Sequence, residues 1–167
     1  MARASEQHYL IALGSNMRHP LYGAPRAVLA EAMLALDGVG HVLAISRIIA
    51  SAPLGPSLRT YANAACVIES DLAPADLLNA LQGIEKQFGR KKSGQRWRAR
   101  TLDLDIVLWS GGVIAENGLS VPHPAFRQRR FVLGPAASIA PGWRDPLTGL
   151  TLAQLYARLT SNAALPR

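Results

Sequence analysis

Apolar and polar residues recur along the chain with two different spacings, and each spacing predicts a type of element. Between positions 101 and 109 apolar residues alternate with Thr101, Asp103 and Asp105, which is the pattern of a half-buried strand. Between 74 and 88 they recur every three or four positions, as in an amphipathic helix. From these spacings and from shorter apolar runs we predict strands at 9–13, 42–50, 61–69 and 101–109, helices at 24–36, 74–88, 126–139 and 152–159, and a short strand beginning at 113–114.

The alternation of predicted strands and helices favours a mixed α/β or α+β layered structure. No repeat, low-complexity segment or linker divides the sequence, so we expect one domain over residues 1–167, with its core at about 8–160. No apolar stretch reaches the roughly 18 residues of a membrane span, and the first eight residues are too short and polar for a secretory signal. The single cysteine, Cys66, lies in an apolar run and is expected in the core. Because one cysteine cannot form an intrachain disulfide, we expect a reducing, cytoplasmic setting.

The positive charge of the chain is concentrated in two short segments. The net charge is +7, yet six Lys or Arg lie within residues 90–100 and three Arg within 127–130, and neither segment contains an acid. Without these nine cations the net charge becomes −2, so the rest of the protein is slightly acidic. A local cationic site suits a compact polyanion such as a nucleoside triphosphate, whereas a long duplex usually recruits a broader basic face.

Asp103 and Asp105 project from the same face of their predicted strand. The period of two places same-face neighbours roughly 6–7 Å apart, and two such carboxylates repel each other unless a cation or a shared proton intervenes. Mg²⁺ prefers oxygen ligands and often takes only one or two carboxylates. A solvated edge-strand face is the alternative, but the six cations directly upstream favour a metal-assisted phosphate site. The opposite face, directed to a core, is predicted to carry Leu102, Leu104, Ile106 and Leu108.

Other polar residues extend this interpretation without deciding it. Trp97 lies among arginines, where it can stack on a base or guanidinium or close over a ligand. A single-stranded nucleic-acid site would use the same ingredients. His123 lies between two prolines and precedes three arginines, and we expect it to donate a hydrogen bond to phosphate. The histidines are too scattered for a zinc site, and no Walker-type glycine-rich loop occurs.

Several motifs, in a fixed order along the chain, carry a resemblance to a known family. They are Ile11-Ala-Leu-Gly-Ser-Asn16, Pro53-Leu-Gly55, Tyr61-Ala-Asn-Ala64, Glu85 with Gly89-Arg90, Arg96-Trp-Arg-Ala-Arg-Thr-Leu-Asp-Leu-Asp-Ile106, Val121-Pro-His123 and Arg129. The stretch from Arg96 to Ile106 is the most specific of them. By these motifs the chain resembles the 6-hydroxymethyl-7,8-dihydropterin pyrophosphokinases along nearly its whole length.

The resemblance implies a fold and a reaction. The fold is α+β, a single α-β-α layered domain with a ferredoxin-like core and a mostly antiparallel mixed sheet. The reaction transfers the β,γ-diphosphate of ATP to the pterin hydroxymethyl oxygen and releases AMP, a step of tetrahydrofolate biosynthesis. The family uses two Mg²⁺ ions with ATP as co-substrate, and no nucleic acid, membrane or obligate protein partner is expected.

The resemblance also implies roles for individual residues. Both magnesium ions are assigned to Asp103 and Asp105. The catalytic positions are Arg90, Arg100, Asp103 and Asp105. The ATP-binding positions are Glu85, Lys92, Trp97, Arg100, Ile106, His123 and Arg129. The pterin-binding positions are Pro53, Leu54, Gly55, Tyr61, Asn63 and Phe131.

The sequence departs from the family pattern at four places. The segment between Gly55 and Tyr61 is shorter than usual, and the segment from Met17 to Gly23 is extended. Lys92 stands where an arginine is common, and Pro124 stands where an aromatic residue is common. Lysine does not reproduce the two-pronged phosphate binding of arginine. The altered segment between Gly55 and Tyr61 supports a second hypothesis, a catalytically reduced paralogue that binds pterin or nucleotide for another purpose. A single-stranded nucleic-acid-binding module is the third.

Overall fold

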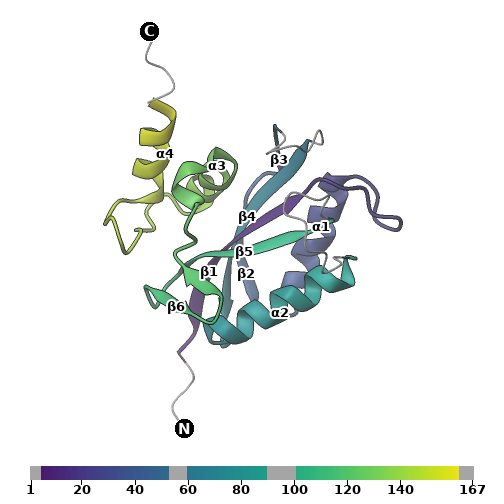
Figure 1. Ribbon diagram of the computed structural model, residues 1–167, viewed down its shortest axis with the longest axis horizontal. Coiled ribbons are helices and arrows are strands. Elements are labelled where there is room, and N and C mark those ends of the chain that lie inside the picture. The colour runs from purple at the N-terminus through teal and green to yellow at the C-terminus, as the bar shows by residue number, and fades with distance from the viewer. Residues whose placement is uncertain (1–4, 53–59, 90–100, 162–167) are drawn as a thin grey trace.

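The computed structural model describes residues 5–52, 60–89 and 101–161, and Figure 1 shows the arrangement of their helices and strands. A short 3-10 turn, η1 (Phe126–Gln128), precedes α3. In chain order the other elements are β1 (Gln7–Ser15), α1 (Pro25–Leu36), β2 (His41–Ile45), β3 (Ile49–Ser51), β4 (Tyr61–Ser70), α2 (Pro74–Gln87), β5 (Asp103–Trp109), β6 (Ile114–Glu116), β7 (Leu119–Val121), α3 (Arg130–Ile139) and α4 (Leu152–Ser161).

The main sheet has the strand order β2-β4-β1-β5, and β3 also pairs with β4. Each of these pairings is antiparallel, which confirms the α+β class. The end of β1 and the beginnings of β4 and β5 lie at the same end of the sheet. Gly14, near the end of β1, pairs with both Asn63 near the start of β4 and Asp103 at the start of β5. This common end gathers the polar residues that the sequence singled out.

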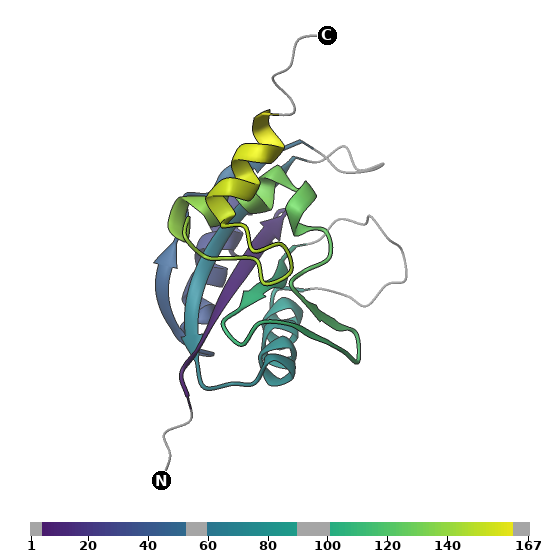
Figure 2. The ribbon, with the colours of Figure 1, turned by 90° about the vertical axis from the view of Figure 1, so that its left-hand side faces the viewer.

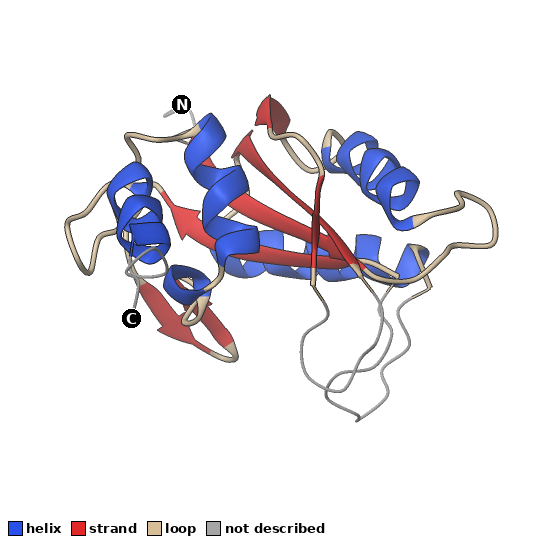
Figure 3. Cartoon of the chain, turned by 90° about the horizontal axis from the view of Figure 1, so that it is seen from above, coloured by secondary structure: helices blue, strands red, loops and turns tan. Residues whose placement is uncertain are grey.

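Helices cover both faces of the sheet, as Figures 1 and 3 show. The first core lies against α1 and α2, and the second lies against α3 and α4. Alternate residues of β1 supply both cores: Ile11 enters the first and Ala12 the second. Cys66 is buried in the first core, where burial raises the pKa of its thiol to about 12, so the prediction that it is a core residue is confirmed.

The β6–β7 hairpin, green in Figure 2, packs beside β5 and adds Leu119 and Val121 to the first core. It is followed by residues 122–129, which lead to α3 and carry His123 and Arg129. The predicted partner strand beginning at 113–114 is therefore confirmed as β6, although its partner is β7.

Two predicted elements are interrupted in the structure. The strand expected at 42–50 is β2 and β3, separated at Ser46, whose main chain and hydroxyl both bond to the main chain of Ala65. The helix expected at 126–139 is the turn η1 followed by α3, because Arg129 has extended backbone angles (φ −111°, ψ 102°). Neither break interrupts the apolar spacing, so the pattern alone could not locate it.

A bulge in β5 changes which residues share a face. Leu10 pairs with Leu108, whereas the next residue of β1, Ile11, pairs with Ile106, which leaves Val107 as an extra residue. Val107 and Leu108 both enter the second core, so the prediction that Leu108 faces the same side as Leu104 and Ile106 is wrong. Asp103 and Asp105 precede the bulge, and strand alternation still places them together.

Within the described part of the chain, no helix combines the length and the apolar character required to traverse a bilayer.

Candidate active site

Asp103 and Asp105 lie half-buried in the first part of β5, on the sheet face that α3 and α4 cover further along. Their partners on β1 are Gly14 and Ala12. Because directly paired residues point to the same face of a sheet, the two carboxylates lie beside positions with almost no side chain. The neighbouring strand therefore places little side chain beside the two carboxylates.

Asn63 completes this row from the other side of β1. It pairs with Gly14, and a Cβ atom added at Gly14 would lie 3.5 Å from Asn63 Oδ1 and 4.0 Å from Asp103 Cβ. Asn63 is 4% exposed, and its Nδ2 donates to Ser51 Oγ at 2.6 Å. The amide is therefore held by β3. Its oxygen lies close to Gly14.

His123 and Arg129 lie on the segment that follows the hairpin, and His123 lies near Asp105. The main-chain amide of His123 donates to the Val107 carbonyl at 3.0 Å, which ties this segment to the bulge of β5. The pKa of His123 is lowered mainly by burial; attraction to Asp105 opposes the shift, and repulsion from Arg129 adds to it. The structure therefore brings Asp105, His123 and Arg129 within electrostatic reach of one another.

The hydrogen bonds of His123 define its tautomer. The amide of Ala125 donates to His123 Nδ1 at 3.2 Å, so in the neutral ring the proton lies on Nε2. With its pKa lowered from 6.5, the ring is neutral at pH 7 and presents an N–H donor. A ring with this proton is compatible with hydrogen-bond donation to phosphate, which stays a prediction.

The N-terminus of α3 points to the same end of the sheet. Ile139, at its C-terminal end, borders a depression that includes Leu43, whereas Gly134, nearer its start, borders only a second depression, which includes Ile49 and extends to Ile139. Ile49 pairs with Asn63 near the start of β4, so α3 begins nearer the end where β4 begins and runs away from it. A helix N-terminus favours an anion, and Arg129 occupies the N-cap position, with its guanidinium 5.8 Å from the Phe131 ring centre.

The remaining predicted site residues are distributed over several places. Tyr61 begins β4, opposite Ser51. Glu85 is 2% exposed in the helical layer formed by α1 and α2. Ile106 is 3% exposed and its side chain lies in the first core, on the face opposite to the aspartates, so only its main chain is available to a nucleotide. Outside the described residues lie Pro53, Leu54, Gly55, Arg90, Lys92, Trp97 and Arg100.

The structure adds two residues that the sequence analysis did not assign to the site. Ser51 orients Asn63, and Gly14 separates Asn63 from Asp103. Gly14 belongs to a motif that was recognised without a role. Ser51 gave no signal, because its contact depends on the pairing of β3 with β4.

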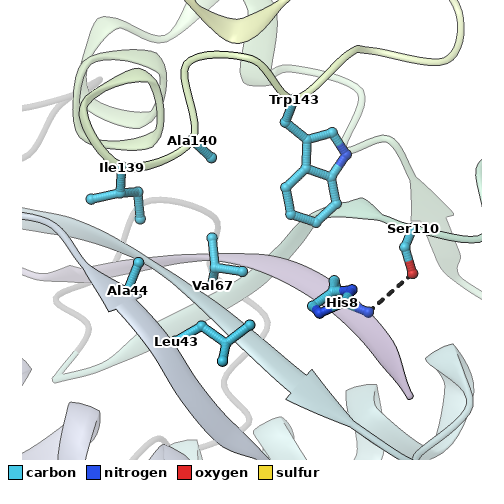
Figure 4. Close-up of a pocket in the computed structure, with 8 residues that line it drawn as sticks. All are labelled: His8, Leu43, Ala44, Val67, Ser110, Ile139, Ala140 and Trp143. Atoms are coloured by element: carbon cyan, nitrogen blue, oxygen red, sulfur yellow. Dashed lines mark hydrogen bonds between the residues drawn. The ribbon is translucent and has the colours of Figure 1, made fainter.

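A depression of about 550 Å³ lies elsewhere on the same sheet face, and Figure 4 shows its lining residues. His8, Trp143 and Ile139 border it. His8 is near the start of β1, whereas Gly14 beside Asp103 is near its end, so the depression is at the opposite end of the sheet. It contains neither of the carboxylates.

The chain matches a family model described as 7,8-dihydro-6-hydroxymethylpterin-pyrophosphokinase (HPPK) over residues 10–141. Two relatives named 2-amino-4-hydroxy-6-hydroxymethyldihydropteridine pyrophosphokinase are similar to it. The relative from Pseudomonas aeruginosa is 38% identical over 90% of this chain and 91% of its own length. The relative from Haemophilus influenzae is 40% identical over 78% of this chain and 79% of its own length.

A solved structure supports the fold independently of close sequence similarity. It is the wild-type HPPK-DHPS of Plasmodium falciparum with pteroate, which has a TM-score of 0.75 and 12% identity. The match covers 95% of this chain and 45% of that longer chain. The family model and the curated relatives together show that the chain belongs to the 7,8-dihydro-6-hydroxymethylpterin-pyrophosphokinase family.

Proposed function

We propose that this chain transfers the β,γ-diphosphate of ATP to the hydroxymethyl group of 6-hydroxymethyl-7,8-dihydropterin, with Asp103 and Asp105 holding two magnesium ions. Membership of the pyrophosphokinase family supports the reaction. The single observation that carries the site is the arrangement of the two aspartates, which share a face with Asn63; of the two, Asp105 lies within electrostatic reach of His123. This arrangement supports a site in which the groups proposed for phosphate and for the heterocycle share one sheet face.

The described side chains fit magnesium better than a metal that requires several protein ligands. In the described ranges no group of three or more His, Cys, Asp or Glu could hold an ion. The proposed site is therefore one in which the protein contributes two carboxylates, those of Asp103 and Asp105. Magnesium suits such a pair because water and phosphate oxygens complete its coordination. When bound, magnesium would neutralise the charge of the β- and γ-phosphates and align them for attack.

The chain's own groups bind and orient the triphosphate. Arg129 offers a planar fork for phosphate oxygens, and neutral His123 offers its Nε2–H. In the transfer, the hydroxymethyl oxygen bonds to the β-phosphorus while the bond from that phosphorus to the α,β-bridging oxygen breaks. The hydroxyl proton is released and AMP departs. Because little covalent help from protein is required, positioning and charge account for the acceleration.

The pterin is proposed to lie towards β4, where Tyr61 and Asn63 begin the strand. An amide reads the donors and acceptors at the edge of a flat heterocycle, and an aromatic ring stacks on its face. Asn63 is suited to the first task because its amide is buried and already oriented by Ser51. Phe131, half-buried in the first turn of α3, is the second proposed aromatic neighbour.

The reaction is tested by identifying the nucleotide product. The protein is incubated with ATP and Mg²⁺, with and without 6-hydroxymethyl-7,8-dihydropterin, and nucleotides are separated by chromatography. We expect AMP to form only when pterin is present, in equal amount to the pterin diphosphate. ADP as product, or no pterin-dependent turnover, would contradict the proposal. Tight pterin or ATP binding without turnover would favour the catalytically reduced paralogue.

The nucleic-acid alternative predicts a different result in a binding assay. A single-stranded oligonucleotide would bind in the absence of Mg²⁺ and compete with ATP, and its affinity would fall steeply with salt. We expect no such competition at physiological salt, because Asp103 and Asp105 repel phosphates when no metal is bound.

Ser51→Ala is expected to weaken pterin binding about fivefold, the equivalent of about 1 kcal/mol for one orienting hydrogen bond. The reason is that Asn63 Nδ2 loses its acceptor and the amide is no longer held. The dissociation constants of pterin and of an ATP analogue are measured by fluorescence or calorimetry. Ser120→Ala, on the exposed side of the hairpin, is the matched control. Unchanged pterin affinity in Ser51→Ala would show that Asn63 needs no such support.

A further inference from the structure

Arg127 and Asp145 form a two-pronged ion pair between the turn η1 and the loop that joins α3 to α4. Arg127 Nε donates to Asp145 Oδ2 at 2.6 Å, and Nη2 donates to Oδ1 at 2.8 Å. The Asp145 side chain is fully buried, and that of Arg127 is 25% exposed. A guanidinium held at two of its three nitrogens is fixed in orientation as well as in distance.

Asp145 is itself firmly held by its own loop. Its carboxylate accepts from the amide of Leu147 at 3.1 Å and from Thr148 Oγ1 at 2.8 Å. Its main chain bonds to Leu150 and Gly149. Burial alone would raise the pKa of Asp145, but these hydrogen bonds and the attraction of Arg127 lower it below its usual value. The carboxylate is therefore charged at neutral pH, and it provides a fixed anchor for Arg127.

Arg127 lies between the two candidate nucleotide groups of its segment. The chain is tied to β5 at His123 through the Val107 carbonyl, and successive turn bonds run from His123 through Phe126 to Arg129. The side chain of Phe126 is completely buried in the second core, and the Arg127 guanidinium lies 4.7 Å from the centre of its ring. The ion pair thus fixes the middle of a short segment that carries one candidate phosphate ligand at each end.

We propose that Arg127 is a positioning residue for the bound nucleotide, acting through His123 and Arg129; this inference rests on the proposed function. The guanidinium is occupied by Asp145, so its contribution is to the placement of its neighbours rather than to direct contact with phosphate. Charge-assisted hydrogen bonds to phosphate depend on the placement of their donors and are stronger than neutral ones. We therefore expect a loss of nucleotide affinity of at least about tenfold when the tether is removed.

The test separates positioning from stability and from simple charge. Dissociation constants for Mg²⁺ with α,β-methylene-ATP are measured by calorimetry, and melting temperatures are recorded for the same samples. The variants are Arg127→Met, Arg127→Lys and the double variant Arg127→Met/Asp145→Asn. The double variant removes the tether without leaving a buried charge unpaired, so its stability is expected to recover relative to Arg127→Met.

Arg130→Met is the charge-matched control, since Arg130 bonds only to the Leu159 carbonyl among its described contacts.

We expect Arg127→Met and the double variant to bind the nucleotide analogue about tenfold more weakly than the wild type, or worse. Arg127→Lys should have an affinity between theirs and that of the wild type. The affinity of Arg130→Met should remain within about threefold of the wild type. The proposal is overturned if the double variant binds nucleotide as the wild type does, or if Arg130→Met loses as much affinity as Arg127→Met. If the double variant does not fold, unchanged affinity in Arg127→Lys overturns it. A wild type that does not bind the analogue would instead refute the proposed function.

Discussion

Asp103→Asn and Asp105→Asn are each expected to lower kcat by at least about a thousandfold, because asparagine keeps the shape of aspartate but not its charge. A neutral amide does not attract Mg²⁺ comparably, and transition-state charge on the transferred group is then poorly neutralised. Both residues are half-buried at the start of β5 beside Gly14 and Ala12, so the fold should persist. Turnover is measured at saturating ATP, Mg²⁺ and pterin.

The control for this prediction is Asp71→Asn, which removes an exposed carboxylate just beyond the other end of β4. It should leave kcat within about twofold of the wild type, since surface substitutions away from special contacts have small effects. Circular dichroism and melting temperatures should confirm that all three variants are folded. Near-normal turnover in either site variant would refute the proposed metal role of that aspartate.

Asp145→Ala is expected to lower the free energy of unfolding by about 3–5 kcal/mol, the range observed when one partner of a buried ion pair is removed. The variant loses both bonds from Arg127 together with those from Leu147 and Thr148. Chemical denaturation followed by circular dichroism measures the change. Asp37→Ala, at an exposed turn, is the control and should cost less than about 1 kcal/mol.

The pH dependence of unfolding checks the cause of this loss. In the folded protein the pKa of Asp145 is lowered from its ordinary value of 3.8. The charged carboxylate therefore contributes its full stabilisation above about pH 4, and this contribution is lost as the pH falls through the pKa of the folded state. The difference in unfolding free energy between wild type and Asp145→Ala should therefore be constant near neutral pH and shrink below about pH 4. A difference that does not change on acidification would indicate that packing, not the ion pair, sets the effect.

Much of the fold could be predicted from the sequence, because the apolar spacing reflects burial directly. The helices at 74–88 and 24–36 and the strand at 61–69 agree closely with α2, α1 and β4. The face shared by Asp103 and Asp105 also followed from alternation alone. The pattern failed at Val107, because a bulge adds a residue without changing the apolar character of the run.

The candidate site was predictable in its residue types but not in its supporting contacts. The family motifs pointed to Asn63, His123 and Arg129, whereas Ser51 carried no signal because its partner lies on another strand. Arg127 was counted only among the cations of its segment, and its partner Asp145 lies 18 residues further along, where no element was predicted. Side-chain pairs that depend on the folded path of the chain cannot be read from local spacing.

The most direct measurement of the central claim counts the divalent ions that the aspartate pair binds. Mn²⁺ is titrated into the protein with saturating α,β-methylene-ATP, whose methylene group prevents the transfer, and free Mn²⁺ is quantified by electron paramagnetic resonance. We expect two ions for each wild-type chain and fewer than two for Asp103→Asn and for Asp105→Asn. Two ions in either variant, or none in the wild type, would contradict the proposed role of the aspartates.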